Sequence, residues 1–198
     1  MRPLLLIVEG QGDEKAAPIL VRKILEQHGH YDVVLRPAQR RGEYPAVAKS
    51  FDNFFLAATK ERAPILWIMD FDNKGYDCPY REASNLSERA NQLHPDWPIA
   101  FAFLVKEFET LFLHDEAATR AVFADIPKQV AFPEQPERIR GAKEWLSEKR
   151  PKGSAYKESV HQQKITAHLN IDLLRQKSAD FAHLERSLLK LINAPIPA

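Results

Sequence analysis

The chain has 198 residues, of which 44% are hydrophobic and 28% charged, and its formal net charge is +1. These values are typical of one globular domain, and they exclude a strong overall field that would attract nucleic acid or a membrane surface. The one cysteine, Cys78, excludes an intrachain disulfide and a thiolate zinc cluster. Because no stretch approaches a membrane span or a secretory signal, we expect a cytoplasmic protein.

Apolar segments that alternate with helical patterns predict the first part of the fold. Leu4–Val8, Asp32–Arg36, Ile65–Met69 and Ile99–Val105 have the character of buried strands. Apolar residues recur at helical spacing between these segments. The alternation continues to about residue 115 and predicts an α/β fold: a Rossmann-like, mostly parallel four-stranded sheet with helices on both faces.

The remainder of the chain has a mainly helical pattern. Helices are expected around Trp145–Leu146 and over His161–Leu174 and Phe181–Ile192, after an interruption from Pro127 to Pro136. We therefore expect a single domain over residues 1–198. Residues 1–115 would form its α/β core and residues 116–198 a helical C-terminal extension.

Acidic residues follow three of the predicted strands. Glu9 follows the first, Asp70 and Asp72 the third, and Glu107 and Glu109 the fourth. Ligands of open α/β sheets bind at the carboxyl ends of the strands. Residues two apart in an extended segment point the same way, so Asp70 and Asp72 are expected to face one point.

Converging carboxylates repel one another unless they are protonated or a cation neutralises them. Oxygen ligands without nearby His or Cys suit magnesium or manganese, so we predict an Mg (or Mn) site at Glu9, Asp70 and Asp72. Glu107 or Glu109 would hold a second ion or act as a base. The implied chemistry is phosphoryl transfer or phosphodiester hydrolysis. The alternative is that these acids cap the helices that follow them.

Basic residues are also expected near this edge of the sheet. Arg41 and Lys74 are candidate phosphate contacts, together with Arg36 and Arg40. The alternative for each of them is a place in a solvated loop.

The order of the acidic motifs resembles the Toprim superfamily, which has a Glu after its first strand and a D-x-D after its third. Glu9 and Asp70–Phe71–Asp72 match both elements. Within the superfamily, the chain most resembles a bacterial family of unknown function, about this long and often encoded beside ATPases. Val8–Glu9–Gly10 with Glu14, the tract Glu107–Leu113 and Ala155–Tyr156–Lys157 carry that resemblance. Asp13–Glu14 in place of a Thr–Glu-like pair, and Leu111 in place of an aromatic residue, depart from the pattern.

The resemblance implies a magnesium-dependent nuclease or nickase that acts on nucleic acid, with a possible partner ATPase and a role in phage defence. One alternative is a non-catalytic Toprim-like binding or regulatory module. Another is a receiver-like phosphoacceptor domain, with Asp70 and Lys106 in the key positions. A dinucleotide site at Gly10–Gln11–Gly12 is disfavoured, because Lys15 stands where a third glycine belongs.

Overall fold

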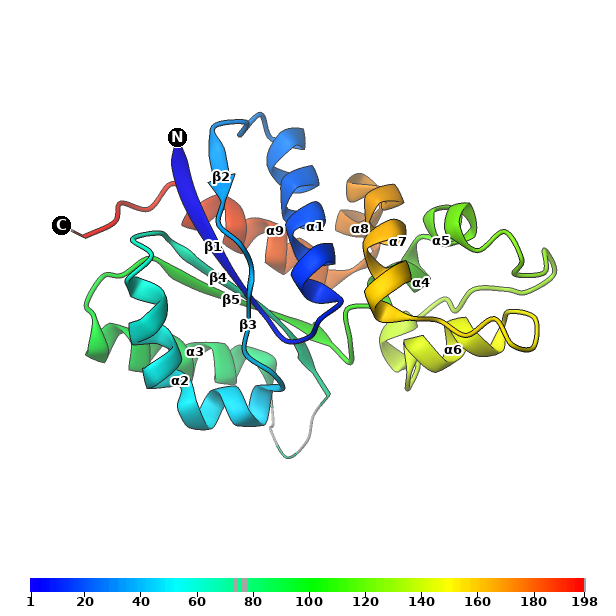
Figure 1. Cartoon of the computed structure of the whole chain (residues 1–198), viewed down its shortest axis with the longest axis horizontal. Helices are drawn as coiled ribbons and strands as arrows, with labels where there is room; N and C mark the ends of the chain where they lie inside the picture. The colour runs from blue at the N-terminus through cyan, green and yellow to red at the C-terminus, as the bar shows by residue number, and fades with distance from the viewer. Residues whose placement is uncertain (73–74, 76–77, 198) are drawn as a thin grey trace.

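The computed structural model describes residues 1–72, 75 and 78–197 and contains a parallel sheet with helices on both faces (Figure 1). The strands are ordered β2-β1-β4-β5, and β3 also pairs with β1. Their bounds are β1 Arg2–Val8, β2 Val33–Leu35, β3 Gln39–Arg40, β4 Ile65–Phe71 and β5 Ile99–Val105. Every pairing is parallel, so the carboxyl ends of the strands meet at one edge.

The helices divide into those that cover the sheet and those that follow β5. The first group is α1 Asp13–Gln27, α2 Tyr44–Thr59, α3 Pro79–Leu93 and α9 Ala179–Leu191. The second group is α4 Thr110–His114, α5 Glu116–Val122, α6 Ala142–Glu148, α7 Gln163–His168 and α8 Ile171–Lys177, with a π-helical segment at Glu158–Gln162. Among the described residues, no helix combines the length and the apolar character needed to cross a membrane.

The strands are apolar throughout because both faces of the sheet are covered. On β1 and β4, Leu6 and Leu66 belong to the core under α1 and α9, whereas Ile7 and Trp67 belong to the core under α2 and α3. Fully burying such a side chain stabilises the fold by roughly 1.5–3 kcal/mol. The expected α/β class, with helices on both faces, is confirmed.

Two short strands, β2 and β3, share the edge position of the sheet beside β1. β2 pairs with Arg2–Leu4, and β3 pairs with Ile7 and Val8 after a break over residues 36–38. The expected four strand positions are therefore present. The segment after β2 contains the short strand β3, which includes Arg40.

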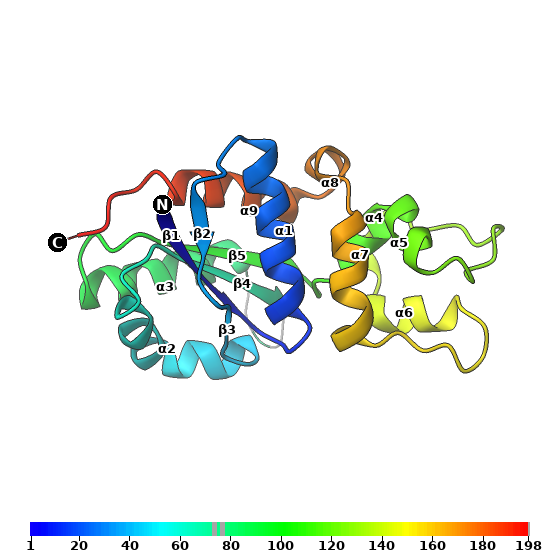
Figure 2. The same cartoon turned by 45° about the horizontal axis from the view of Figure 1, so that its top comes forward.

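The helices after β5 lie beyond the carboxyl ends of the strands, and α9 then returns to the sheet (Figure 2). The expected continuous helix over His161–Leu174 is wrong. α7 ends at His168, and α8 begins after Asn170, whose side chain accepts a hydrogen bond from the Leu173 backbone N–H at 3.1 Å. Asp115 accepts the Asn170 backbone N–H at 2.8 Å, which fixes the break. This capping stabilises the start of a new helix.

Candidate functional site

Glu9 and Asp70 are brought together by the register of adjacent strands. Val8 pairs with Ile68, so Glu9 follows β1 close to the point where Asp70 stands near the end of β4. Asp70 has the same parity as Leu66 and Ile68, and it therefore faces the side of the sheet that α1 covers. The expectation that these two acids lie near one edge agrees with this register.

The first turn of α1 adds a buried carboxylate to this edge. Asp13 is 9% exposed and begins the helix just after β1. Its side chain accepts the Gly10 backbone N–H at 2.8 Å and the Gln162 side-chain amide at 2.6 Å. Asp13 is thereby held between the β1–α1 turn and the π-helical segment.

The segment after β5 contributes two more acids. Glu109 is 1% exposed, and Glu107 is half-buried. Between them, the Phe108 backbone N–H donates to Asp70 Oδ1 at 2.8 Å, so this turn is attached to the end of β4. The turn places Glu109 near Asp70 although 38 residues separate Phe108 from Asp70.

A lysine and a tyrosine from the C-terminal half complete the site. Lys143 Nζ, from the first turn of α6, lies 3.7 Å from Glu107 Oε2, 3.8 Å from Glu109 Oε2 and 2.6 Å from Glu158 Oε1. The Tyr156 hydroxyl donates to Glu109 Oε1 at 2.8 Å. The carboxylates therefore share one ammonium group, and Glu109 is oriented by a buried hydrogen bond.

Burial raises the pKa of the acids in this site, and repulsion from neighbouring carboxylates adds to the rise at Asp70. Burial raises the pKa of Asp70 well above its usual range, and the nearby carboxylates of Asp13, Glu109 and Glu9 raise it further. Burial likewise raises the pKa of Asp13, although the hydrogen bonds from Gly10 and Gln162 oppose this. The raised pKa values reflect first the burial of these carboxyls and, at Asp70, also the nearness of other carboxylates.

Glu109 shows the same effect. Burial raises its pKa to about 8, while Lys143 opposes the rise and Glu107 adds to it. Burial alone would lower the pKa of Lys143, but Glu109, Glu158 and Asp70 reverse this and raise it. Lys143 therefore stays charged at neutral pH, whereas Glu109 carries a proton for much of the time.

The remaining predicted site residues lie further out. Asp72 follows β4 with an exposed side chain. Arg41 is hydrogen-bonded through its backbone N–H to the Val8 carbonyl at 2.9 Å, but its guanidinium packs over the Phe54 ring and bonds to Gln39. Lys74 lies outside the described residues, so the structure provides no description of this candidate phosphate contact.

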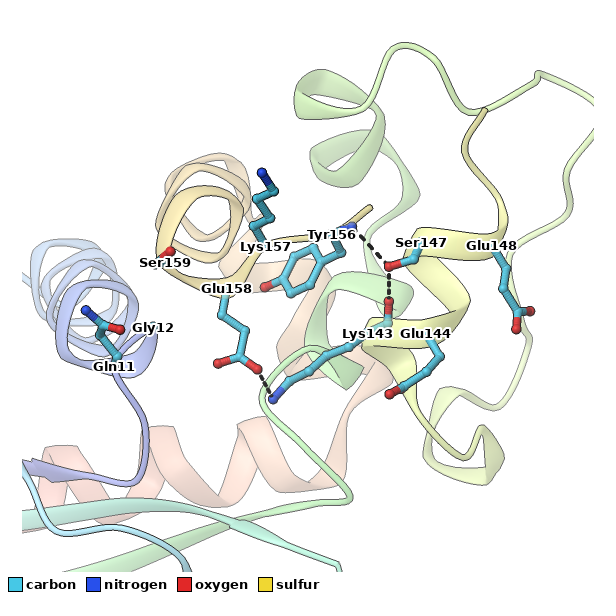
Figure 3. Close-up of a pocket in the computed structure, with 10 residues that line it drawn as sticks. All are labelled: Gln11, Gly12, Lys143, Glu144, Ser147, Glu148, Tyr156, Lys157, Glu158 and Ser159. Atoms are coloured by element: carbon cyan, nitrogen blue, oxygen red, sulfur yellow. Dashed lines mark hydrogen bonds and ion pairs between the residues drawn. The ribbon is translucent and has the colours of Figure 1, made fainter. Parts of the chain in front are cut away.

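A pocket of about 580 Å³ adjoins the acids between the start of α1, α6 and the π-helical segment. Figure 3 shows the Lys143 and Glu158 side chains meeting between this pocket and the sheet, while Lys157 points away from them. Gly12 lines the pocket where a side chain has no room, because an added Cβ would lie 1.7 Å from Gln162 Oε1. The Lys143–Glu158 ion pair thus lies between the buried carboxylates and an open space.

The donor chemistry fits a hard divalent cation. Glu109 Oε2 and Gln162 Oε1 are buried acceptors without a hydrogen-bond partner, and an acceptor in that state is costly. Carboxylate and amide oxygens are the donors that magnesium and manganese take. No group of three or more His, Cys, Asp or Glu side chains within the described ranges is arranged as a ready metal shell. The acids instead surround the Lys143 ammonium.

Sequence reasoning did not propose Asp13 or Lys143 as part of the site. Asp13 had one usable signal, since it closely follows Glu9 in the sequence and begins the helix after the first strand. Lys143 had none, because it is one of many charged residues in a helical region. Only the folded chain shows that α6 directs this lysine toward the sheet.

Three comparisons relate the chain to known proteins. The model of the family described as "Domain of unknown function (DUF4276)" matches residues 8–189. No curated protein matches the chain. Among solved structures, the C-terminal region of the Xanthomonas campestris pv. campestris OLD protein matches with a TM-score of 0.48 and 12% identity, over 96% of this chain and 95% of that chain. The corresponding region of the Burkholderia pseudomallei OLD protein matches with a TM-score of 0.46 and 13% identity, over 98% of each chain.

Proposed function

Since the chain belongs to the DUF4276 family of domains of unknown function, as the resemblance of its motifs implied, we propose its activity from the site itself: metal-dependent hydrolysis of a nucleic-acid phosphodiester. One observation carries this proposal. Asp70 stands at the carboxyl edge of a parallel sheet among the carboxylates of Asp13, Glu109 and Glu9, which come from separate segments. Such a concentration of negative charge is costly in the folded state unless a cation binds there.

Glu9, Asp70 and Asp72 are the proposed ligands for Mg²⁺ or Mn²⁺, and the position of Asp13 adds it to this set. A bound divalent ion supplies a Lewis acid that polarises a phosphodiester and neutralises charge on its oxygens. The donors are all oxygens, which agrees with either ion. The exposed side chain of Asp72 is free to turn toward the other three.

The chain's own residues have distinct proposed roles. Lys143 offers a permanent positive charge to a phosphate oxygen, in exchange for its contacts with Glu107 and Glu109. Glu109 holds a proton near neutral pH, which it can donate from Oε2 and later take back. The Tyr156 hydroxyl fixes the other carboxyl oxygen, Oε1. Tyr156 therefore acts as a positioning residue.

Phosphate contacts away from the reacting group are proposed for Arg41 and Lys74. Arg41 would have to leave Gln39 and the Phe54 ring to reach a nucleic-acid backbone. We also propose, from the family resemblance alone, a cytoplasmic location, a partner ATPase and a role in phage defence.

The second candidate is a module that binds without catalysis. The contacts of Lys143 favour it, because an ammonium already occupies the space between Glu107, Glu109 and Glu158. A module of this kind would use the lysine as its permanent cation and would need no metal.

A cleavage assay separates the two candidates. Single- and double-stranded DNA and RNA are incubated with the full chain and Mg²⁺ or Mn²⁺, and Asp70→Asn, Glu9→Gln and Lys143→Met are compared with wild type. Each variant is expected to lose at least about a hundredfold in rate. The matched control Glu148→Gln removes an exposed acid that lines the same pocket and should leave the rate unchanged. Cleavage that survives Asp70→Asn would contradict the proposed site, and metal-independent binding without cleavage would favour the module.

A further inference from the structure

The π-helical segment and α7 carry a stripe of basic side chains along one side. The stripe consists of Lys157, His161, Lys164 and His168, which are spaced four, three and four residues apart. Lys157, Lys164 and His168 are exposed, and His161 is half-buried. Lys157 and Lys164 form no ion pair with any described residue. Because the whole chain has a formal charge of only +1, the stripe is a local concentration of positive charge.

His161 is held in a fixed orientation in the middle of this stripe. Its Nδ1 accepts the Lys157 backbone N–H at 2.8 Å, and its ring contacts the rings of Phe123 and Tyr156, with centroids 4.9 Å and 5.7 Å away. The neutral ring therefore carries its proton on Nε2. This Nε2–H has no hydrogen-bond partner among the described residues, so it can donate to a bound ligand.

The charges around His161 are mostly positive. Burial lowers the pKa of His161, and the nearby cations of Arg150, Lys164 and Lys157 lower it further, whereas Asp125 opposes them. Asp125 is itself paired with Arg150 at 3.0 Å. The two lysines are therefore left without a neutralising partner, and together they attract an anion.

The stripe begins at the pocket that adjoins the proposed metal site. Lys157 lines this pocket, and Figure 3 shows its side chain pointing away from the Lys143–Glu158 ion pair. On the other side of the pocket, the exposed lining residues of α6 are the acids Glu144 and Glu148. An anionic chain that enters the site is therefore expected to leave the pocket over the π-helical segment.

The length of the stripe favours a chain of phosphates over a single phosphate ion. Lys157 and Lys164 are separated by about 10 Å along the helix axis, at about 1.5 Å per residue. One strand of nucleic acid carries a phosphate about every 3.4 Å of duplex axis, so more than one phosphate can reach the stripe. The element itself agrees with a functional role, because π-helical turns are rare and frequently occur at functional sites.

We propose that this stripe binds the sugar–phosphate backbone of a nucleic-acid strand at phosphates beyond the one that reacts. Lys157 and Lys164 contact phosphate oxygens as point charges, and the His161 Nε2–H donates to one of these oxygens. Such contacts position a strand without reading its sequence. The identity of the ligand rests on the proposed function, and the stripe directs the strand along α7 rather than toward Arg41.

Fluorescence anisotropy with labelled single- and double-stranded DNA and RNA tests the stripe. The full chain carries Asp70→Asn, so that cleavage does not interfere. Adding Lys157→Gln with Lys164→Gln is expected to raise the Kd at least about tenfold at low salt. The slope of log Kd against log salt concentration should become about 1.4–1.8 smaller, because two phosphate contacts are lost. A lysine with a purely structural role would not change this slope.

Lys49→Gln with Lys60→Gln is the matched control. It removes the same charge from exposed positions in α2 and directly after it, on the opposite face of the sheet. This control should leave the Kd and its salt dependence unchanged. Circular dichroism confirms that each variant folds.

Cleavage kinetics separate the stripe from the proposed function. Without Asp70→Asn, the double variant Lys157→Gln with Lys164→Gln should raise KM at least about tenfold and keep kcat within about threefold, since its contacts lie away from the reacting group. Cleavage by this variant with the wild-type KM would overturn the stripe and leave the proposed function standing. Binding that depends on both lysines, without cleavage by the wild-type chain, would support the stripe and contradict hydrolysis. A chain that binds no nucleic acid, or that binds a poly-glutamate peptide of equal charge as tightly, would overturn the proposal.

Discussion

At the scale of single residues, the site is defined by charge that the fold leaves poorly compensated. Lys143 is in contact with Glu107, Glu109 and Glu158. Burial keeps water from compensating the remaining negative charge. Glu109 consequently takes up a proton that an exposed glutamate would release. Carboxylates whose pKa values are shifted in this way are typical of functional sites.

The raised pKa of Glu109 makes stability depend on pH. Its pKa is about 8 in the folded chain against an ordinary 4.5. Between these values the folded chain holds a proton that the unfolded chain has lost, so the free energy of unfolding falls as pH rises. The slope due to Glu109 is at most about 1.4 kcal/mol per pH unit. Urea unfolding of the metal-free chain from pH 5 to pH 8 measures it.

Glu109→Gln should flatten that slope and leave the variant more stable than wild type near pH 8. The amide keeps an acceptor for the Tyr156 hydroxyl. Part of the slope should persist because burial also raises the pKa of Asp70. An identical slope in wild type and Glu109→Gln would show that the Glu109 carboxyl does not titrate in this range.

At the scale of elements, the site depends on close contact between the start of α1 and the π-helical segment. Gln162 is 2% exposed and holds Asp13 through its side-chain amide. It reaches Asp13 across Gly12, where no side chain fits. This contact connects the first turn after β1 to a segment far along the chain, since 149 positions separate Gln162 from Asp13.

Gly12→Ala tests this contact. The added methyl group would have to displace the Gln162 amide, and overpacking of this kind costs about 1–3 kcal/mol. Thermal unfolding should show the loss, and the double variant Gly12→Ala with Gln162→Ala should recover part of it. Gly10→Ala is the control, because its added Cβ would meet only the Asp13 carboxyl, with Oδ2 at 3.2 Å. Equal losses at Gly10 and Gly12 would contradict the role given to Gln162.

The elements also explain what the sequence could and could not predict. Glu9, Asp70 and Glu109 could be predicted to lie near one another, because each stands at or after the carboxyl end of an apolar strand and parallel strands end at a common edge. Asp13 begins α1, and the first turn of that helix buries it at the site. Lys143 could not be found, because its position depends on how the helices after β5 fold back. No local pattern encodes that path.

At the scale of the whole molecule, the N- and C-terminal parts share one core. Phe181, Leu184 and Leu188 of α9 are fully buried beside Leu6 and Ile68 of the sheet. β5 is also connected to α9 through Asp180. A core completed by the last helix is a property of one cooperative unit.

We therefore expect the chain to unfold in one transition. With Trp97 also replaced by Phe, the Trp145→Phe chain keeps only Trp67, which reports on the sheet, and the Trp67→Phe chain keeps only Trp145, which reports on α6. The fluorescence of each chain should give the same midpoint in urea as its circular dichroism. Removal of residues 178–198 should prevent folding, because it exposes the sheet face that α9 covers. Two separate transitions, or a folded truncated chain, would contradict a single unit.

The most direct test of the proposed metal site is calorimetric titration of the full chain with Mn²⁺. We expect saturable binding that releases protons at pH 7, because the ion displaces protons from the crowded carboxyls. Asp70→Asn and Glu9→Gln should abolish this binding, and Glu148→Gln should keep it. Absence of Mn²⁺ binding to the wild-type chain, or equal binding to Asp70→Asn, would contradict the claim that these acids form a cation site.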